Sequence, residues 1–220
     1  MLTFVQLLRY TRGNTTLTDS TKAKPLDVNA LFAQFDPRTG AVDGASHVVR
    51  HLSDLHGCFA DTQAYDDALT QSDPVVYRVA TLEPAGGDGQ LHYGVGTLMP
   101  GRVGAEYYLT KGHLHAWRPA AELYLGLQGE GMLLLEDEAT GATRAVPLVA
   151  HSAVYVPGHT AHRTINTGAV PLTYIGVYPA AAGHDYGAIA ARNFGCVVVS
   201  VAGRPTVMDR AVFLQSLVGM

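Results

Sequence analysis

The chain has 220 residues, of which 47% are hydrophobic and 15% charged, and its formal net charge at pH 7 is −4. This length and composition predict a globular protein with one substantial core and exclude an intrinsically disordered chain. The mild negative charge, without a run rich in lysine and arginine, argues against nucleic acid and anionic membranes as partners. No apolar stretch is long enough to span a membrane, and Cys58 and Cys196 are too few for a disulfide framework, so we expect a cytoplasmic protein without a signal peptide.

The first third of the chain is predicted to be mixed in structure. Residues 1–24 are polar and rich in threonine, and we expect them to form an N-terminal extension with weak structure of its own. Residues 25–220 are expected to form a single domain. Within that domain, short helical turns are predicted at 45–55 and 61–69, the second ended by the polar residues and proline at 72–74.

From residue 75 onward, short apolar segments alternate with glycine and proline. Their even spacing predicts strands of a β-sandwich or barrel, so the fold class is expected to be all-β with short helical segments towards both ends. A short helix is expected at 186–194. The expected strands are residues 75–79, 91–99, 123–127, 132–135, 153–156, 172–177 and 197–201.

Three histidines and a glutamate form the most informative pattern in the sequence. His113 and His115 are separated by one residue, Glu122 follows His115, and His162 comes much later. Because alternate residues of a β-strand face the same side, the first two imidazoles can point at one place, and a neighbouring strand can add the carboxylate. Three nitrogens and one carboxylate suit a divalent transition metal such as iron, manganese, nickel or zinc. His159, three residues before His162, is an alternative ligand.

The order of these residues resembles the cupin superfamily. A first motif contains the two close histidines and Glu122, and a second runs from Pro157 through His162 to Asn166. The resemblance implies a double-stranded β-helix, or jelly-roll barrel. The long gap before Glu122 is similar to that of the cupin-type phosphoglucose isomerases. Segments that resemble this family are residues 50–54, 73–77, 100–106, 110–115, 121–124, 155–157, 161–164 and 178–187, within a region from about residue 25 to about residue 210.

The resemblance implies a metal-dependent aldose–ketose isomerase that interconverts glucose 6-phosphate and fructose 6-phosphate as a homodimer. It also implies roles for residues at matching positions. The metal ligands would be His113, His115, Glu122 and His162, with one divalent transition metal per subunit. The phosphate end of the substrate would meet Tyr77, Thr110 and the backbone of Gly112, and the reacting carbons would lie near Tyr124, Tyr178, His184 and Tyr186.

One position departs from the family pattern. The family has a hydroxyl side chain where this chain has Gly96, and Thr97 could shift to replace that contact. Lys111 is equally compatible with a phosphate contact and with a solvated strand residue. Tyr124 and Tyr178 could instead be core aromatics, since tyrosine is common in strands.

The chemistry expected of such a site can be stated without the resemblance. Moving a carbonyl between C1 and C2 requires that hydrogen leave C2 and arrive at C1. A bound metal would act as a Lewis acid on the developing enediolate, Glu122 could act as the base, and Tyr178 or His184 could move the hydroxyl protons. A hydride shift between the two carbons is the competing mechanism. Two further functions stay open at this point: another metal-dependent cupin enzyme such as a dioxygenase, and a sugar-binding cupin without catalysis.

Overall fold

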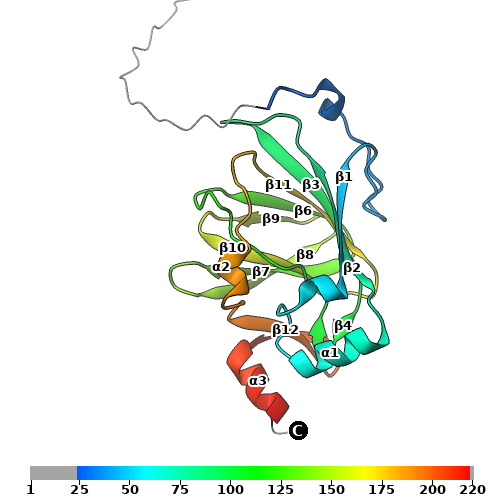
Figure 1. Ribbon diagram of the computed structural model, residues 1–220, viewed down its shortest axis with the longest axis vertical. Helices are drawn as coiled ribbons and strands as arrows, with labels where there is room; N and C mark the ends of the chain where they lie inside the picture. The colour runs from blue at the N-terminus through cyan, green and yellow to red at the C-terminus, as the bar shows by residue number, and fades with distance from the viewer. Residues whose placement is uncertain (1–23, 219–220) are drawn as a thin grey trace, which may run out of the picture.

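The computed structural model describes residues 24–218, so the predicted N-terminal extension, apart from Lys24, lies outside the described residues (Figure 1). Strands dominate the described part of the chain, which confirms the expected all-β class. The strands are β1 (Ser46–His51), β2 (Val75–Leu82), β3 (Leu91–Leu98), β4 (Arg102–Val103), β5 (Glu106–Tyr107), β6 (Glu122–Gln128), β7 (Glu130–Asp137), β8 (Thr143–Val149), β9 (Ala153–Val156), β10 (Thr160–Asn166), β11 (Leu172–Pro179), β12 (Cys196–Val201) and β13 (Arg204–Asp209). The helices are α1 (Thr62–Gln71), α2 (Gly187–Ala190) and α3 (Arg210–Val218), with short 3-10 turns η1 (Val28–Leu31) and η2 (Leu52–Leu55).

Two antiparallel sheets form the barrel. The larger has the order β1-β2-β3-β11-β6-β9 and the smaller has the order β10-β7-β8. Isolated bridges from Leu109 to Ile165 and from His113 to His162 place the segment 109–113 along the free edge of β10. The arrangement β3-β11-β6-β9 against 109–113, β10, β7 and β8 is the strand order of a jelly roll, the double-sheet architecture of cupins. The expected barrel is therefore confirmed.

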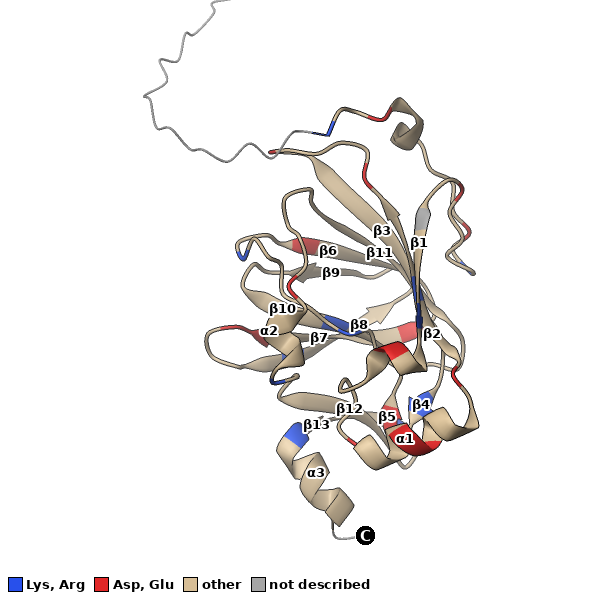
Figure 2. Ribbon diagram, in the orientation of Figure 1, with Lys and Arg blue, Asp and Glu red and all other residues tan. Residues whose placement is uncertain are grey.

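A third sheet, with the order β13-β12-β5-β4, lies beside α1 and α3 at the C-terminal end of the molecule (Figure 1). The lysine and arginine residues coloured in Figure 2 are distributed over several elements of the sheets and helices. Among residues 24–218, no helix is long and apolar enough to cross a membrane.

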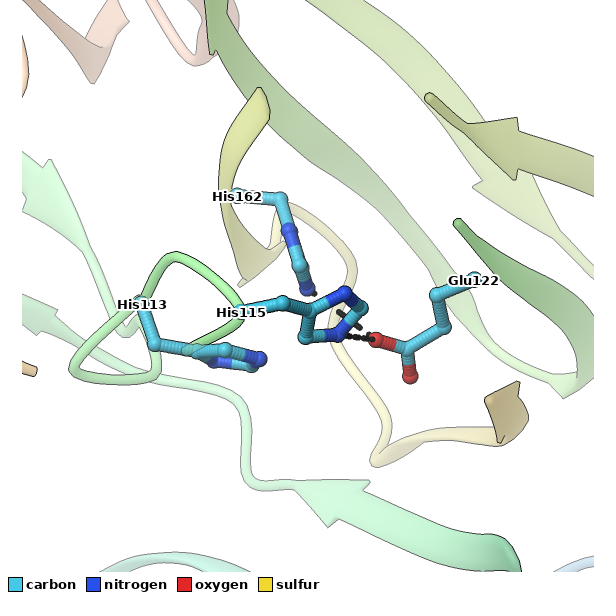
Figure 3. A group of neighbouring side chains, drawn as sticks. All are labelled: His113, His115, Glu122 and His162. Atoms are coloured by element: carbon cyan, nitrogen blue, oxygen red, sulfur yellow. Dashed lines mark hydrogen bonds and ion pairs between the residues drawn. The ribbon is translucent and has the colours of Figure 1, made fainter. Parts of the chain in front are cut away.

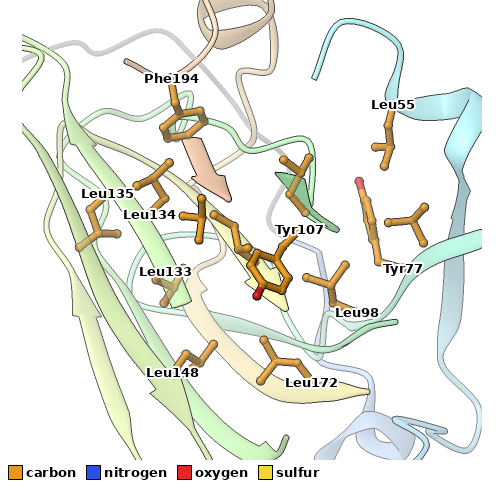
Figure 4. Close-up of a cluster of buried hydrophobic side chains, with 14 of the residues drawn as sticks. Leu55, Tyr77, Leu98, Tyr107, Leu133, Leu134, Leu135, Leu148, Leu172 and Phe194 are labelled. Atoms are coloured by element: carbon orange, nitrogen blue, oxygen red, sulfur yellow. The ribbon is translucent and has the colours of Figure 1, made fainter. Parts of the chain in front are cut away.

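Side chains from both barrel sheets meet in one apolar core (Figure 4). Leu98 of β3 and Leu172 of β11 face Leu133 of β7 and Leu148 of β8, and all four are fully buried. Burial of each such side chain stabilises the fold by about 1.5–3 kcal/mol. Phe194 extends this core towards the segment that carries the close histidines.

The helical turn predicted at 45–55 is partly wrong. Residues 46–51 form β1, which pairs with β2 from Ser46 opposite Thr81 to His51 opposite Val75, and only the turn at 52–55 is helical. β-branched Val48 and Val49 favour an extended backbone, and β2 offers a free edge to pair with. The second prediction is confirmed as α1, whose first turn is capped by the Asp61 carboxylate accepting from the backbone N–H of Ala64 at 2.9 Å.

The other differences have separate physical causes. The helix expected at 186–194 is only the single turn α2. β4, β5, β8, β10 and β13 were not predicted. β10 carries threonine, histidine, arginine and asparagine, yet six of its seven residues are buried. His162 and Thr164 border the cavity inside the barrel, and Arg163 packs against the ring of Phe194. A strand with polar residues at buried positions has no alternating pattern to recognise.

Candidate metal centre and cavity

Four predicted side chains converge inside the barrel (Figure 3). His113, His115, Glu122 and His162 each offer a ligand atom, and these atoms all lie within 4.8 Å of one another. The predicted convergence is therefore confirmed. The two close histidines lie in an extended segment with isolated bridges rather than in the regular strand that we expected. Reciprocal backbone hydrogen bonds of 3.1 and 3.0 Å between His113 and His162 hold that segment against β10.

His159, the alternative ligand, is not part of this group. Its side chain is 61% exposed, and its Nδ1 lies 3.8 Å from Glu138 at the surface. Its backbone has a φ of 58°, which turns the chain immediately before β10. His162, three residues later, is 1% exposed and faces Glu122. The structure therefore places His162, and not His159, with the other three side chains.

The hydrogen bonds around the group leave metal-ligand atoms free. Nδ1 of His115 donates to the carbonyl oxygen of Ala120 at 3.0 Å, and Nδ1 of His162 donates to that of Thr160 at 3.1 Å. In a neutral imidazole the other ring nitrogen, Nε2, then carries a lone pair. Both Nε2 atoms lie 3.1–3.2 Å from Oε2 of Glu122. Two nitrogen lone pairs and a carboxylate oxygen repel one another at these distances unless a proton or a cation lies between them. These three atoms therefore fit as ligands of a divalent metal.

The electrostatics of His113 and Glu122 agree with this fit. Nε2 of His113 is buried and has no hydrogen-bond partner among residues 24–218. Burial lowers the pKa of His113 well below its ordinary value, and the neighbouring His162 lowers it further, which keeps the imidazole neutral and able to ligate. Burial alone would raise the pKa of Glu122, but the imidazoles of His115 and His162 beside its carboxylate outweigh burial and lower the pKa. The carboxylate is therefore ionised.

A cavity of about 470 Å³ opens beside the four side chains. Every residue predicted to be catalytic or to bind substrate lines it. These residues are Tyr77, Thr110, Gly112, Glu122, Tyr124, Tyr178, His184 and Tyr186. Tyr124 also belongs to the apolar core, so it packs with the core and borders the cavity at once. Lys111 is also among the lining residues.

Three of the lining residues lie next to the histidine group. The ring centroid of His184 is 4.5 Å from that of His113 and 5.7 Å from that of Tyr178, and the His184 ring stacks on Tyr186 at 5.8 Å. Burial lowers the pKa of His184 and raises the pKa of Tyr178 to about 12. At neutral pH the imidazole can therefore accept a proton, and the phenol keeps its own proton to donate.

Arg118 connects the two loops that carry these residues. Its Nη1 donates to the carbonyl oxygen of His115 at 2.6 Å, and its Nη2 pairs with Oδ2 of Asp185 at 2.7 Å. Asp185 is the neighbour of His184 and exchanges backbone hydrogen bonds of 3.2 and 2.8 Å with Leu114. One guanidinium thus fixes His184 relative to the close histidines.

Hydroxyl groups and the backbone of Gly112 also border the cavity. Thr110 Oγ1 accepts a hydrogen bond of 3.0 Å from the backbone N–H of Thr164, and burial raises the pKa of Tyr77 to about 12. Gly112 has a φ of 74°, and a Cβ there would lie 2.7 Å from Phe194 and 3.0 Å from Arg163. Glycine is therefore required at this turn, both because the backbone conformation disfavours other residues and because a Cβ would collide with its neighbours.

The expectation that Thr97 could replace a hydroxyl at Gly96 is wrong. Successive residues of a strand face opposite sides, and Gly96 borders the cavity, so Thr97 points away from it. Thr97 is 3% exposed, and its hydroxyl donates to the carbonyl oxygen of Thr39 at 3.2 Å. The volume in front of Gly96 is filled by the ring of Tyr174.

Several lining residues had no predicted role. They include Arg50, Glu83, Arg163, Thr164 and Tyr174. Thr164 lies two residues after His162 on the same strand, and this spacing was a usable signal that it shares the same face. Tyr174 could not be assigned without the pairing of β11 with β3, which sets it opposite Gly96.

Comparison with known proteins assigns the family. A family model described as Glucose-6-phosphate isomerase (GPI) matches residues 49–211. The chain is 41% identical over 179 residues to a glucose-6-phosphate isomerase of Pyrococcus abyssi (strain GE5 / Orsay), covering 81% of this chain and 94% of that protein. It is 43% identical over 179 residues to one of Thermococcus onnurineus (strain NA1), with the same coverage of 81% and 94%. Among solved structures, an oxalate oxidase matches with a TM-score of 0.44 and 13% identity, over 52% of this chain and 56% of that chain. By its sequence, the chain belongs to the glucose-6-phosphate isomerase family.

Proposed function

We propose that this protein interconverts glucose 6-phosphate and fructose 6-phosphate at a divalent transition metal held by His113, His115, Glu122 and His162. The observation that carries the proposal is the position of this group at the wall of a cavity of about 470 Å³ that hydroxyl groups also line. Family membership supports the same reaction, since the curated relatives are named glucose-6-phosphate isomerases.

The metal, when bound, supplies Lewis-acid polarisation of the oxygens on C1 and C2 of the open-chain sugar. We propose one metal per subunit. Iron, manganese, nickel and zinc all fit a set of three imidazole nitrogens and one carboxylate oxygen. The buried, unpartnered Nε2 of His113 and the close approach of the other two Nε2 atoms to Glu122 support a cation at this point.

We assign the transfer of the carbon-bound proton between C2 and C1 to Glu122. Its Oε2 faces the imidazoles of His115 and His162, while its Oε1 lies over Gly176, which borders the cavity. In the direction from aldose to ketose, the carboxylate takes the proton from C2 and returns it to C1. Its lowered pKa means that it begins the step ionised.

We assign the transfer of protons to and from the sugar oxygens to His184 and Tyr178. The neutral imidazole accepts the proton of the C2 hydroxyl as the C2 carbonyl forms, and a proton is delivered to the oxygen on C1, for which the Tyr178 phenol is the nearby donor. The imidazolium of His184 then passes its proton to the phenolate of its neighbour Tyr178, which restores both groups. The overall change then balances: one hydrogen moves from C2 to C1 and one from O2 to O1. The same groups serve ring opening, which also moves a single hydroxyl proton.

Tyr77, Thr110 and the backbone of Gly112, which all line the cavity, are proposed to hold the phosphate. Hydrogen bonds from hydroxyl and amide groups to a phosphate are stronger than bonds between neutral groups. Gly112 supports this role because it lines the cavity with its backbone, and its positive φ and close neighbours leave no room for a side chain at this position. We further propose a homodimer in the cytoplasm, on the basis of the family resemblance, which size-exclusion chromatography with light scattering would test.

The direct test is turnover of fructose 6-phosphate, with glucose 6-phosphate detected through coupled reduction of NADP. We expect turnover that disappears after treatment with a chelator and returns when a divalent transition metal is added back. A protein that shows no turnover under any metal would contradict the proposed reaction. Turnover that survives complete chelation would contradict the role of the metal.

A further inference from the structure

The ring of Tyr174 fills the space that a side chain at Gly96 would occupy. The two residues are direct partners in the pairing of β11 with β3, so their side chains would face the same side of the sheet. A Cβ built on Gly96 would lie 2.6 Å from both Cε2 and the hydroxyl oxygen of Tyr174. Any side chain at position 96 would therefore displace this ring, and the phenol stands where a side chain from β3 would otherwise reach the cavity.

The ring of Tyr174 lies further from the histidine group than its neighbour Tyr124 on β6. The two tyrosine centroids are 5.4 Å apart, and the centroid of Tyr124 is 5.9 Å from that of His162. Tyr174, Gly96, Thr110 and Thr164 all line the same cavity. Thr110 is one of the residues to which we assign the phosphate, and Thr164 is hydrogen-bonded to it.

The spacing along β10 fits a sugar phosphate. Thr164 lies two residues beyond His162 on the same face of the strand, a separation of about 6.6 Å. The backbone of Thr164 bonds to Thr110 in both directions, at 3.0 Å each. The hydroxyl groups of Thr110 and Thr164 are thus separated along the barrel from the imidazole of His162. This separation is comparable to the distance between the first carbons and the phosphate of an open-chain hexose phosphate.

The Tyr174 hydroxyl is prepared to donate. Burial raises its pKa, so the phenol stays protonated at neutral pH. Its O–H borders the cavity, where it can donate to an acceptor, and an anionic oxygen is the acceptor that gains most from such a donor.

We propose that Tyr174 is a phosphate-binding residue, whose hydroxyl donates to the phosphate of the substrate in place of a hydroxyl side chain at position 96. This rests on the proposed function, since it concerns the same cavity and the same substrate. The Tyr174 hydroxyl reaches the cavity from β11, and the absence of a side chain at Gly96 on β3 is what makes room for it.

Tyr174→Phe tests the proposal by removing one oxygen atom. In the metal-loaded protein we expect the KM for fructose 6-phosphate to rise about tenfold or more, because a hydrogen bond to a charged group is lost, while kcat changes much less. The dissociation constant of inorganic phosphate, measured by calorimetry, should rise with it. Tyr155→Phe is the matched control, since that tyrosine is 64% exposed on β9. Unchanged KM and unchanged phosphate affinity in Tyr174→Phe would overturn the proposal.

A second pair of variants moves the hydroxyl from one strand to the other. Tyr174→Leu combined with Gly96→Ser is compared with Tyr174→Leu combined with Gly96→Ala, so that the two proteins differ by one oxygen at position 96. We expect the serine protein to bind inorganic phosphate more tightly than the alanine protein. Equal affinities would overturn the idea that positions 96 and 174 serve the same contact.

Phosphate binding does not depend on turnover, so failure of this proposal and failure of the proposed reaction have different signatures. A wild-type protein without isomerase activity whose phosphate affinity falls in Tyr174→Phe would remove the reaction and keep Tyr174 as an anion ligand. A wild-type protein that isomerises the sugar phosphates, with the same KM and phosphate affinity after Tyr174→Phe, would keep the reaction and remove Tyr174.

Discussion

Gly176 on β11 leaves the space that Oε1 of Glu122 occupies. A Cβ built on Gly176 would overlap that oxygen and would lie 3.6 Å from the carboxyl carbon. Gly176 is paired with Gly94 of β3 on one side and with Tyr124 of β6 on the other. The orientation of the carboxylate among the histidines thus depends on a missing side chain on a neighbouring strand, far away in the sequence.

We expect Gly176→Ala to weaken metal binding about 10- to 100-fold, because the new methyl group pushes the carboxylate out of position. Turnover should fall with metal occupancy. Gly94→Ala is the control: its Cβ would meet the Ala80 carbonyl oxygen at 3.3 Å and Val79 at 3.5 Å, not Glu122. Metal content after dialysis against a graded chelator series measures the difference. Equal metal retention in the two variants would show that Gly176 does not control the carboxylate.

His184→Ala should slow turnover about a hundredfold or more and leave the metal in place. The reason is that His184 contacts the ring of His113 and lines the cavity without being one of the four converging side chains. His162→Ala provides the contrast, since it should abolish metal retention. Elemental analysis beside steady-state kinetics separates the two effects. If both variants lose metal equally, the assignment of His184 to proton transfer is wrong.

Arg118→Met should lower kcat about 10- to 100-fold, because it releases the link between the His115 backbone and Asp185 that sets the position of His184. The effect should be non-additive with Asp185→Asn, since both changes break the same ion pair. Arg38→Met, which removes an arginine whose side chain is 80% exposed, is the control. Additive losses in the double variant would argue that Arg118 acts elsewhere.

Phe194→Ala should reduce the free energy of unfolding by about 3–5 kcal/mol. Phe194 is completely buried, its ring lies 4.4 Å from the guanidinium carbon of Arg163, and it backs the turn at Gly112. Phe32→Ala removes a phenylalanine that is 80% exposed and should change stability little. Urea denaturation of the metal-loaded proteins compares them. Similar midpoints for the two variants would contradict the packing role given to Phe194.

The sequence was sufficient to predict the barrel and the convergence of the four side chains. Strands such as β6 and β11 are apolar segments ended by glycine or proline, which is a strong local signal. His113 and His115 share a face because they are two residues apart, and that geometry held even though their segment makes isolated bridges instead of a regular strand.

What the sequence could not provide depends on contacts between strands. β10 was missed because most of its buried residues are polar. The expectation for Thr97 failed for a simpler reason: neighbouring residues of a strand face opposite sides, so Thr97 could not replace a side chain at Gly96. Tyr174 and Arg118 act through partners distant in the chain, namely Gly96 and Asp185. The expected weak structure of residues 1–24 stays a prediction, since all but Lys24 lie outside the described residues.

The most direct test of the central claim is a titration of metal-free protein with a single divalent transition metal, such as Mn²⁺, while the conversion of fructose 6-phosphate is recorded. We predict that activity rises in proportion to added metal and reaches a plateau at one equivalent per chain, that His159→Ala behaves like the wild type, and that His162→Ala stays inactive. Full activity of the metal-free protein, or wild-type behaviour of His162→Ala, would contradict the account.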